Sequence, residues 1–310
     1  MSILIVGAGV TGCYTAARMQ ERGLDVAVLA RGDRADRLER DGLVMRDGLT
    51  EEERTVTLRI VRAPLDEHFP IAMVCVQEIH RPKLATLLEE LPGKPIIWYL
   101  GNTTKGFEEI GQRLGKERVL GGFPGVGGTW DGETLVFADR MEPQHQPFDK
   151  LVVGEAFPEA ASAVQVVKDT FVPAGFNVEH YSQIMGWHWT HVAMVLPLAG
   201  LVYAHDVDME TVVADKALLM RTMRATAQAL TAVKKAGHPI LPWRLGLIRW
   251  LPAGLGARKV GSLFQSRFGQ IALAGHASVA RGEMQSLAAD LMELAGADAG
   301  PDLRHLMDLI

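Results

Sequence analysis

The first half of the chain alternates short runs of branched apolar residues with longer segments in which apolar positions recur at helical spacing. Short continuous apolar runs are typical of strands buried on both faces, as in parallel sheets. Such runs predict strands at residues 2–6, 24–30, 69–76, 95–100, 119–123, 151–153 and 176–181. Helical segments are predicted between them at residues 13–22, 34–41, 81–91, 105–114 and 158–174. This order predicts a Rossmann-type, doubly wound parallel sheet with right-handed crossovers.

Two stretches of the first half look different, because they alternate polar and apolar residues. Residues 43–46 and 54–61 predict a strand pair. Residues 130–137 predict a hairpin that turns at Asp131-Gly132. Residues 121–128 are dense in glycine, but no helix-like run follows them, so we do not expect a second nucleotide loop there.

From residue 182 onward the pattern is helical, and it shows no convincing strand. The helices predicted there are residues 183–203, 209–236, 255–274, 283–295 and 303–309. We therefore expect an α/β domain over residues 1–180 and an all-α domain over residues 181–310. The second domain is expected to serve substrate binding or dimerisation, and a homodimer is left open.

The composition is that of a globular protein of 310 residues, with 48% hydrophobic and 22% charged side chains. A net charge of -5 argues against a nucleic-acid partner, which would require a basic face. Cys13 and Cys75 lie in predicted buried elements. We expect them to be free thiols in a reducing, cytoplasmic compartment.

Residues 181–204 contain no Asp, Glu, Lys or Arg and are long enough to span a membrane. The segment nevertheless carries His188 and His191, which are costly to place in lipid. We therefore predict a helix buried in protein and no membrane partner.

The N-terminal strand runs directly into Gly7-Ala8-Gly9-Val10-Thr11-Gly12 and then into a predicted helix. In such a unit the first glycine permits a tight turn, the second admits a pyrophosphate, and the third lets the helix pack on the strand. The phosphates then lie on the free N–H groups of the helix start. The predicted dinucleotide-binding residues of this loop are Gly7, Gly9, Val10, Thr11 and Gly12.

The residues at the tip of the second strand indicate whether NAD or NADP is bound. NAD sites usually place an acidic side chain here, where it binds the ribose 2′-hydroxyl. This chain has Ala30-Arg31 with Arg34 close behind, and a guanidinium suits a 2′-phosphate. Asp33 is the contrary observation, although it follows the strand and can cap the next helix. The pattern favours NADP(H), with Arg31 as a binding residue.

Together these motifs are similar to those of the ketopantoate reductase (2-dehydropantoate 2-reductase) family, in the 6-phosphogluconate-dehydrogenase-like superfamily. The resemblance covers essentially the whole chain and rests on the glycine loop, Arg31, the strand-end Asn102, Pro197-Leu198-Ala199 and Glu283. It implies that NADPH binds the first domain, with Asn102 beside it, and that a 2-oxo acid binds in a cleft between the domains.

The chain lacks both lysines of the family pattern. Gln77 takes the place of the lysine beside the cofactor, and His188 takes the place of the catalytic lysine. Val192 and Leu196 replace asparagines that line the family's pocket, so a substrate hydroxyl would meet a more apolar wall. These departures disfavour ketopantoate itself, while the reaction class is kept.

The predicted catalytic residues are His188, Glu283 and Asn102. Reduction of a carbonyl needs a proton donor at the new alkoxide, and an imidazolium at His188 would supply it. The alternative is a core histidine packed between two tryptophans. By resemblance Glu283 would hold the polar end of the substrate, although a capping carboxylate is the other interpretation. His276 and Ser278 are expected to face the same cleft.

No metal site is predicted. His191 lies one turn from His188, but two histidines without a carboxylate partner are weak evidence for one.

Three functions are compatible with these observations. The leading hypothesis is an NADPH-dependent reductase of a small 2-oxo acid. The second is an opine- or hydroxyacid-dehydrogenase-like oxidoreductase in which a histidine is the acid–base group. The third is a non-catalytic NADP-binding sensor, which the loss of both family lysines favours.

Overall fold

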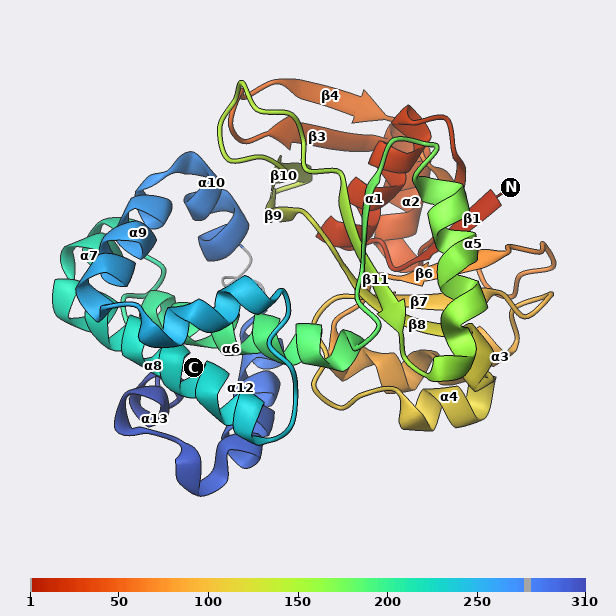
Figure 1. Ribbon diagram of the computed structural model, residues 1–310. Helices are drawn as coiled ribbons and strands as arrows, with labels where there is room; N and C mark the ends of the chain where they lie inside the picture. Colours follow the sequence, from red (N-terminus) through yellow and green to blue (C-terminus); the bar gives the residue numbers. More distant parts are fainter. Residues whose placement is uncertain (1, 276–279) are drawn as a thin grey trace. The chain divides into compact units, whose positions relative to one another are not determined.

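The computed structural model describes residues 2–275 and 280–310, and the chain divides into two compact units (Figure 1). The first unit comprises Met1–Gly101 and Gly106–Ile184, and the second comprises Asn102–Lys105 and Met185–Ile310. The main division therefore lies at the start of helix α6 (Ile184–Tyr203). A four-residue segment from the first half of the sequence belongs to the second unit.

The first unit is built on an eight-stranded sheet in the order β12-β11-β8-β7-β6-β1-β2-β5. All neighbouring strands are parallel except β8 and β11, so the predicted doubly wound sheet is confirmed. The strands are β1 (Ser2–Val6), β2 (Asp25–Leu29), β5 (Arg59–Val61), β6 (Ile71–Val74), β7 (Ile96–Leu100), β8 (Val119–Pro124), β11 (Lys150–Glu155) and β12 (Asn177–His180). Because β2 and β6 lie on opposite sides of β1, the topological switch point falls at β1.

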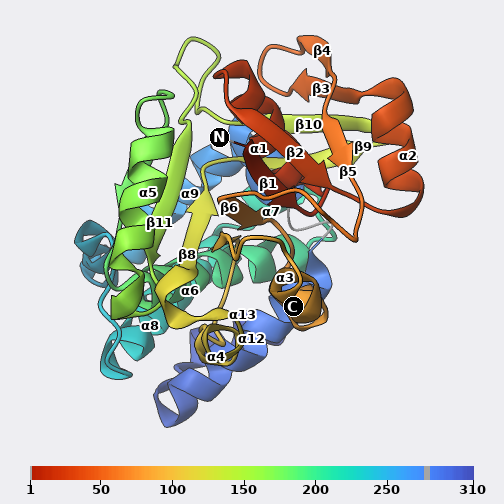
Figure 2. The same cartoon turned by 90° about the vertical axis from the view of Figure 1, so that its right-hand side faces the viewer.

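The helices of this unit pack on the sheet, as α5 does on β8 and β11 (Figure 2). They are α1 (Val10–Glu21), α2 (Gly32–Asp41), α3 (Ala85–Glu89), α4 (Glu108–Leu114) and α5 (Ala161–Phe171). The helix predicted over residues 81–91 is instead a 3₁₀ segment, Glu78–Leu84, followed by the short α3. Pro82 lies within the 3₁₀ segment, and its missing N–H is incompatible with a regular α-helix interior.

The predicted strand pair and hairpin join in a second sheet of four strands, in the order β4-β3-β10-β9. Its strands are β3 (Leu43–Asp47), β4 (Glu53–Val56), β9 (Gly127–Asp131) and β10 (Thr134–Ala138). The run 54–61, predicted as one strand, forms two. Its first part pairs with β3, whereas its second part, β5, pairs with β2 of the large sheet.

The described part of the second unit is helical around its own apolar core. Its helices are α6, α7 (Met209–Ala214), α8 (Lys216–Lys235), α9 (Ala253–Gln265), α10 (Arg267–Gly269), α12 (Arg281–Ala295) and α13 (Pro301–Met307). The helix predicted over residues 209–236 breaks at Asp215, whose carboxylate accepts a 2.8 Å hydrogen bond from the Leu218 N–H and so caps α8. Over the described residues no helix is long and apolar enough to cross a membrane.

Candidate functional site

The glycine loop follows β1, and its three glycines meet different surroundings. Gly7 has a φ of 110°, and a Cβ placed on it would lie 2.7 Å from the Val76 side chain. A Cβ on Gly12 would lie 1.9 Å from the Gly7 carbonyl oxygen. A Cβ on Gly9 would meet nothing within 4 Å. The first and third glycines are therefore required by the packing of the loop, while the second borders open space.

This open space lies at the N-terminus of α1. Gly9 is the N-cap residue, no side chain caps the helix, and its first turn contains no acidic residue. The first N–H groups and the positive end of the helix dipole therefore remain available to an anion. Strand β9 borders the loop, since a Cβ on its Gly128 would lie 3.2 Å from Val10 Cγ1. These residues fit the phosphates of a dinucleotide.

The tip of β2 carries two arginines of different character. Arg31 is exposed at the N-cap of α2. The Arg34 guanidinium carbon lies 4.0 Å from the ring centroid of Trp130 on β9, in cation–π geometry. Burial, together with the nearby Arg37, lowers the pKa of Arg34. Within the described chain, Nη1 of Arg34 is buried and has no hydrogen-bond partner.

The Arg34–Trp130 pair is absent from the sequence-based prediction. Trp130 reaches α2 because β10 pairs with β3, which lies ninety residues or so earlier in the chain. A hairpin motif predicts the local turn but not which distant strand it joins. The only sequence feature that pointed to this pair is the arginine-rich start of α2.

The strand-end residues on the other side of the switch point are Gln77 and Asn102. Gln77 is partly buried and follows β6, the neighbour of β1. Asn102 follows β7 and is 4% exposed. Its Nδ2 donates to Oε2 of Glu283 at 3.4 Å, and Glu283 is itself 3% exposed in the first turn of α12. The structure thus brings two of the three predicted catalytic residues together within the second unit.

A second hydrogen bond joins the same segment to the same helix. Thr104 Oγ1 donates to Oδ2 of Asp290 at 2.5 Å. Glu283 and Asp290 are two helical turns apart and so share one face of α12. The segment 102–105 is flanked by Gly101 and Gly106, whose φ angles of 140° and 71° favour glycine. Sequence reasoning did not identify Thr104 or Asp290, because nothing local links them.

The third predicted catalytic residue, His188, lies on α6 and is 1% exposed. Its ring meets Trp187 edge to face, with centroids 5.5 Å apart. His191 stacks on the same tryptophan, with its ring centroid 5.2 Å from that of Trp187 and the two rings 8° from parallel. Burial agrees with both interpretations of His188, so its catalytic role stays a prediction. His276 and Ser278 lie outside the described residues.

The two cysteines and the candidate metal ligands limit the kinds of catalysis that the chain can support. Burial raises the pKa of both Cys13 and Cys75 to about 12, so these thiols are protonated at neutral pH and are poor nucleophiles. The described residues include no group of three His, Cys, Asp or Glu side chains placed to hold a metal ion.

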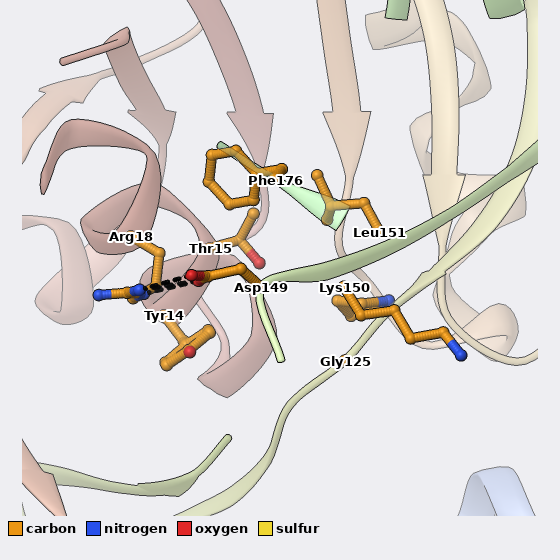
Figure 3. Close-up of a pocket in the computed structure, with 9 residues that line it drawn as sticks. Tyr14, Thr15, Arg18, Gly125, Asp149, Lys150, Leu151 and Phe176 are labelled. Carbon is orange, nitrogen blue, oxygen red and sulfur yellow. Dashed lines mark hydrogen bonds and ion pairs between the residues drawn. The ribbon is translucent and has the colours of Figure 1, made fainter. Parts of the chain in front are cut away.

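A small pocket beside α1 contains none of the predicted site residues (Figure 3). Arg18 and Asp149 meet in it through hydrogen bonds of 2.8 and 2.9 Å from one guanidinium nitrogen to the two carboxylate oxygens. Arg22 also contacts Asp149. Because the Asp149 carboxylate is paired with both guanidinium groups, we interpret these residues as a structural contact between α1 and the start of β11, not as a ligand site.

Residues 3–150 match the family model described as ketopantoate reductase PanE/ApbA. This N-terminal part, just under half of the chain, is similar to the ketopantoate reductase family. An uncharacterized oxidoreductase of Bacillus subtilis (strain 168), YkpB, is 24% identical over 251 residues, which is 78% of each chain. The family model supports the predicted family resemblance, and the relative supports the prediction of an oxidoreductase.

Solved structures of ketopantoate reductases and related enzymes share the fold of the whole chain. A D-mandelate dehydrogenase bound to NADH and anilino(oxo)acetate has a TM-score of 0.73 at 14% identity, covering 100% of this chain and 97% of the other. A dimeric ketopantoate reductase from Staphylococcus aureus has a TM-score of 0.70 at 9% identity, covering 99% and 96%. At these identities the likeness is one of fold alone.

Proposed function

We propose that the protein is a cytoplasmic, NADPH-dependent reductase of a small 2-oxo acid. The observation that carries this proposal is the uncapped start of α1 beside the open space at Gly9, in a chain whose N-terminal part is similar to the ketopantoate reductase family. That arrangement suits a dinucleotide pyrophosphate. When bound, the nicotinamide would supply the hydride.

The chain's own residues would bind and orient the substrate and move the proton. Asn102 and Glu283 are buried and touch each other, so each restrains the other's side chain. Oδ1 of Asn102 has no hydrogen-bond partner among the described residues and is available to an O–H or N–H donor. The Glu283 carboxylate would accept from a substrate hydroxyl, and an imidazolium at His188 would give its proton to the new alkoxide oxygen.

The preference for NADPH rests on the tip of β2. No carboxylate stands at Ala30-Arg31, and Arg34 is held against Trp130 with a buried, unpaired N–H group. Two guanidinium groups would bind the 2′-phosphate and gain little from a 2′-hydroxyl. The NADH in the D-mandelate dehydrogenase structure belongs to that protein, which is only 14% identical.

Cofactor titrations test this choice. We expect NADPH to bind at least tenfold more tightly than NADH, which corresponds to about 1.4 kcal/mol. Arg31→Ala and Arg34→Ala should remove most of the difference and leave NADH affinity nearly unchanged. Arg40→Ala is the matched control, because Arg40 lies at the far end of α2 and pairs with Asp41. Equal affinities in the unchanged protein would contradict the proposal.

The chemistry is tested by NADPH oxidation with a panel of 2-oxo acids. We expect His188→Ala to lower kcat by about a hundredfold or more, and His188→Lys to recover part of it. If the imidazolium is the donor, kcat should fall as rising pH removes its proton, and the variant should lose that dependence. Glu283→Gln should act mainly on KM. Tight NADPH binding without oxidation of any panel member would favour the sensor.

A second candidate is a hydroxyacid dehydrogenase with an apolar substrate, in the manner of the D-mandelate dehydrogenase neighbour. The feature in its favour is that apolar Val192 and Leu196 stand where the family resemblance implies pocket asparagines; in this structure both side chains belong to the core of the second unit. The substrate panel separates the two candidates if it includes aromatic and polar 2-oxo acids. Preference for phenylglyoxylate would support the second.

A further inference from the structure

The second unit carries an unusual exposed apolar surface, which we name the 243–255 surface. It consists of Trp243, Leu247, Trp250, Leu251 and Leu255, whose side chains are 66%, 56%, 78%, 37% and 51% exposed. They lie on the 3₁₀ segment Trp243–Trp250 and on the start of α9. Isolated exposed hydrophobic residues are normal, but a run of large ones within a single segment marks an interaction site.

The packing of this segment does not require these side chains. Leu245, Ile248, Ala253 and Val260 turn inward and pack on the core of the unit. The exposed residues are interspersed with these inward-facing ones, and the chain is extended at Leu251 and Pro252, where the 3₁₀ segment gives way to α9. The segment is therefore apolar both where it packs on the core and where it meets solvent, and we infer that its exposed apolar side chains contact a partner.

The charges around the surface indicate the chemistry of that partner. Residues 216–282 contain no Asp or Glu, although the whole chain has a net charge of -5. The basic residues of this stretch are Lys216, Arg221, Arg224, Lys234, Lys235, Arg244, Arg249, Arg258, Lys259, Arg267 and Arg281. A stretch of this kind attracts an anionic partner.

In the part of the chain that the structure describes, some basic residues of this stretch are paired with carboxylates, and those next to the surface are not. Arg221 and Arg224 pair with Asp302, and Lys235 pairs with Asp298. In contrast, Arg244, Arg249, Arg258 and Lys259 form no ion pair with any described residue. The Arg244 and Arg249 guanidinium carbons each lie 5.8 Å from the ring of an exposed tryptophan. Within residues 2–275 and 280–310, the four cations next to the apolar surface are thus not neutralised by ion pairs, and neither are Lys216 and Lys234 elsewhere in the stretch.

We propose that the 243–255 surface binds peripherally to an anionic lipid membrane. Tryptophan and leucine side chains insert at the level of the headgroups, while the adjacent arginines and lysine contact lipid phosphates. A second copy of the chain fits less well, because a symmetric interface would place the same unpaired cations opposite each other. The proposal departs from the sequence-based expectation of no membrane partner, because it concerns binding at the surface of a bilayer and requires no spanning helix.

Co-sedimentation of the full-length protein with lipid vesicles tests the proposal. We expect binding to vesicles of equimolar phosphatidylcholine and phosphatidylglycerol, weaker binding to phosphatidylcholine alone, and release as salt screens the charges. W243S/W250S should reduce binding about tenfold or more. Val172→Ser is the matched control, because Val172 is 52% exposed but lies outside the surface, after α5.

A charge series separates local from overall charge. Substitution of Arg244, Arg258 and Lys259 by Gln should weaken binding to the anionic vesicles. The same change at Arg221, Arg224 and Lys235, whose charges are paired, should have little effect on vesicle binding by the folded protein. Circular dichroism confirms folding in each case. Binding that is equal for W243S/W250S and the unchanged protein overturns the proposal. So does a lack of vesicle binding, and a dimer that W243S/W250S dissociates would then identify a second copy as the occupant.

Discussion

Gly9 and Gly12 belong to the same loop, yet the structure requires them for different reasons. At Gly12 a side chain would collide with the backbone of Gly7, whereas at Gly9 it would project into open space. Gly9 also has a φ of -82°, which any residue can adopt. The constraint at Gly12 is therefore on folding, and the constraint at Gly9 arises only when a ligand approaches.

This difference predicts opposite outcomes for two similar substitutions. Gly12→Ala should lower the free energy of unfolding by about 1–3 kcal/mol, because the added methyl group overpacks the turn. Gly9→Ala should leave stability nearly unchanged but weaken NADPH binding by about tenfold or more, since the methyl group occupies the approach of the pyrophosphate. Denaturant unfolding and cofactor titration measure the two effects. Equal loss of stability in both variants would contradict this account.

At this scale the sequence predicts what is local. The glycine loop, Arg31 and a helix that begins close to Glu283 follow from spacing within one element, although α12 begins two residues earlier, at Arg281. The platform that Trp130 gives Arg34 and the bond between Thr104 and Asp290 could not be predicted. Each joins segments that are far apart in the chain, and periodicity carries no information about such pairs.

Helix α12 fixes the position of the segment 102–105, because two of its carboxylates accept hydrogen bonds from that segment. Glu283 accepts from Asn102 and Asp290 accepts from Thr104. The positive φ angles of Gly101 and Gly106 let the backbone turn sharply on both sides of the segment. The position of Asn102 therefore depends on a helix that follows much later in the sequence.

We predict that Asp290 is a positioning residue. Asp290→Ala and Thr104→Val should each lower stability by about 1–2 kcal/mol, and the double variant should lose little more than either single one. Both should also lower kcat if Asn102 acts on the substrate. Glu293→Ala, which removes an exposed carboxylate from the same helix, is the control. Strict additivity in the double-mutant cycle would argue against the bond.

Helix α13 is attached to α8 through Asp302, which accepts hydrogen bonds from Arg221 and Arg224. Partial burial acts to raise the pKa of this carboxyl, but the two arginines outweigh it, and its pKa is lowered overall. The stabilisation is therefore present above the carboxyl's unfolded-state pKa and is lost as the pH falls through the folded-state value. We expect Asp302→Asn to cost about 1 kcal/mol at neutral pH and nothing in strong acid, as measured by denaturant unfolding across pH.

Several element boundaries depend on interactions that periodicity does not report. The continuous helix predicted over residues 209–236 is interrupted by a capping bond at Asp215. The alternating run 54–61 is divided because its two parts have different partner strands. The large parallel sheet was predictable, since its strands are buried on both faces and their composition shows it, as with Ile3, Leu4 and Ile5 at 0% exposure.

At the scale of the whole molecule, each unit has its own apolar core. Trp98 is fully buried in the core of the first unit, and Leu230 is fully buried in that of the second. Large apolar side chains in separate cores contribute to separate cooperative units when few contacts link them.

We therefore predict two unfolding transitions in calorimetry. Trp98→Ala should destabilise one of them by about 3–5 kcal/mol, and Leu230→Ala should destabilise the other by about 2–5 kcal/mol. NADPH should shift the transition that Trp98→Ala affects, because the glycine loop lies in the first unit. A single transition that both substitutions move equally would show that the units unfold together.

The membership of Asn102–Lys105 in the helical unit has a consequence for recombination. Neither unit is one continuous stretch of gene, so a fragment ending at Ile184 would carry these four residues away from Glu283 and Asp290. A chimaera that joins the nucleotide-binding half of one relative to the helical half of another would face the same mismatch. The four residues and α12 should therefore be inherited, and exchanged, as a pair.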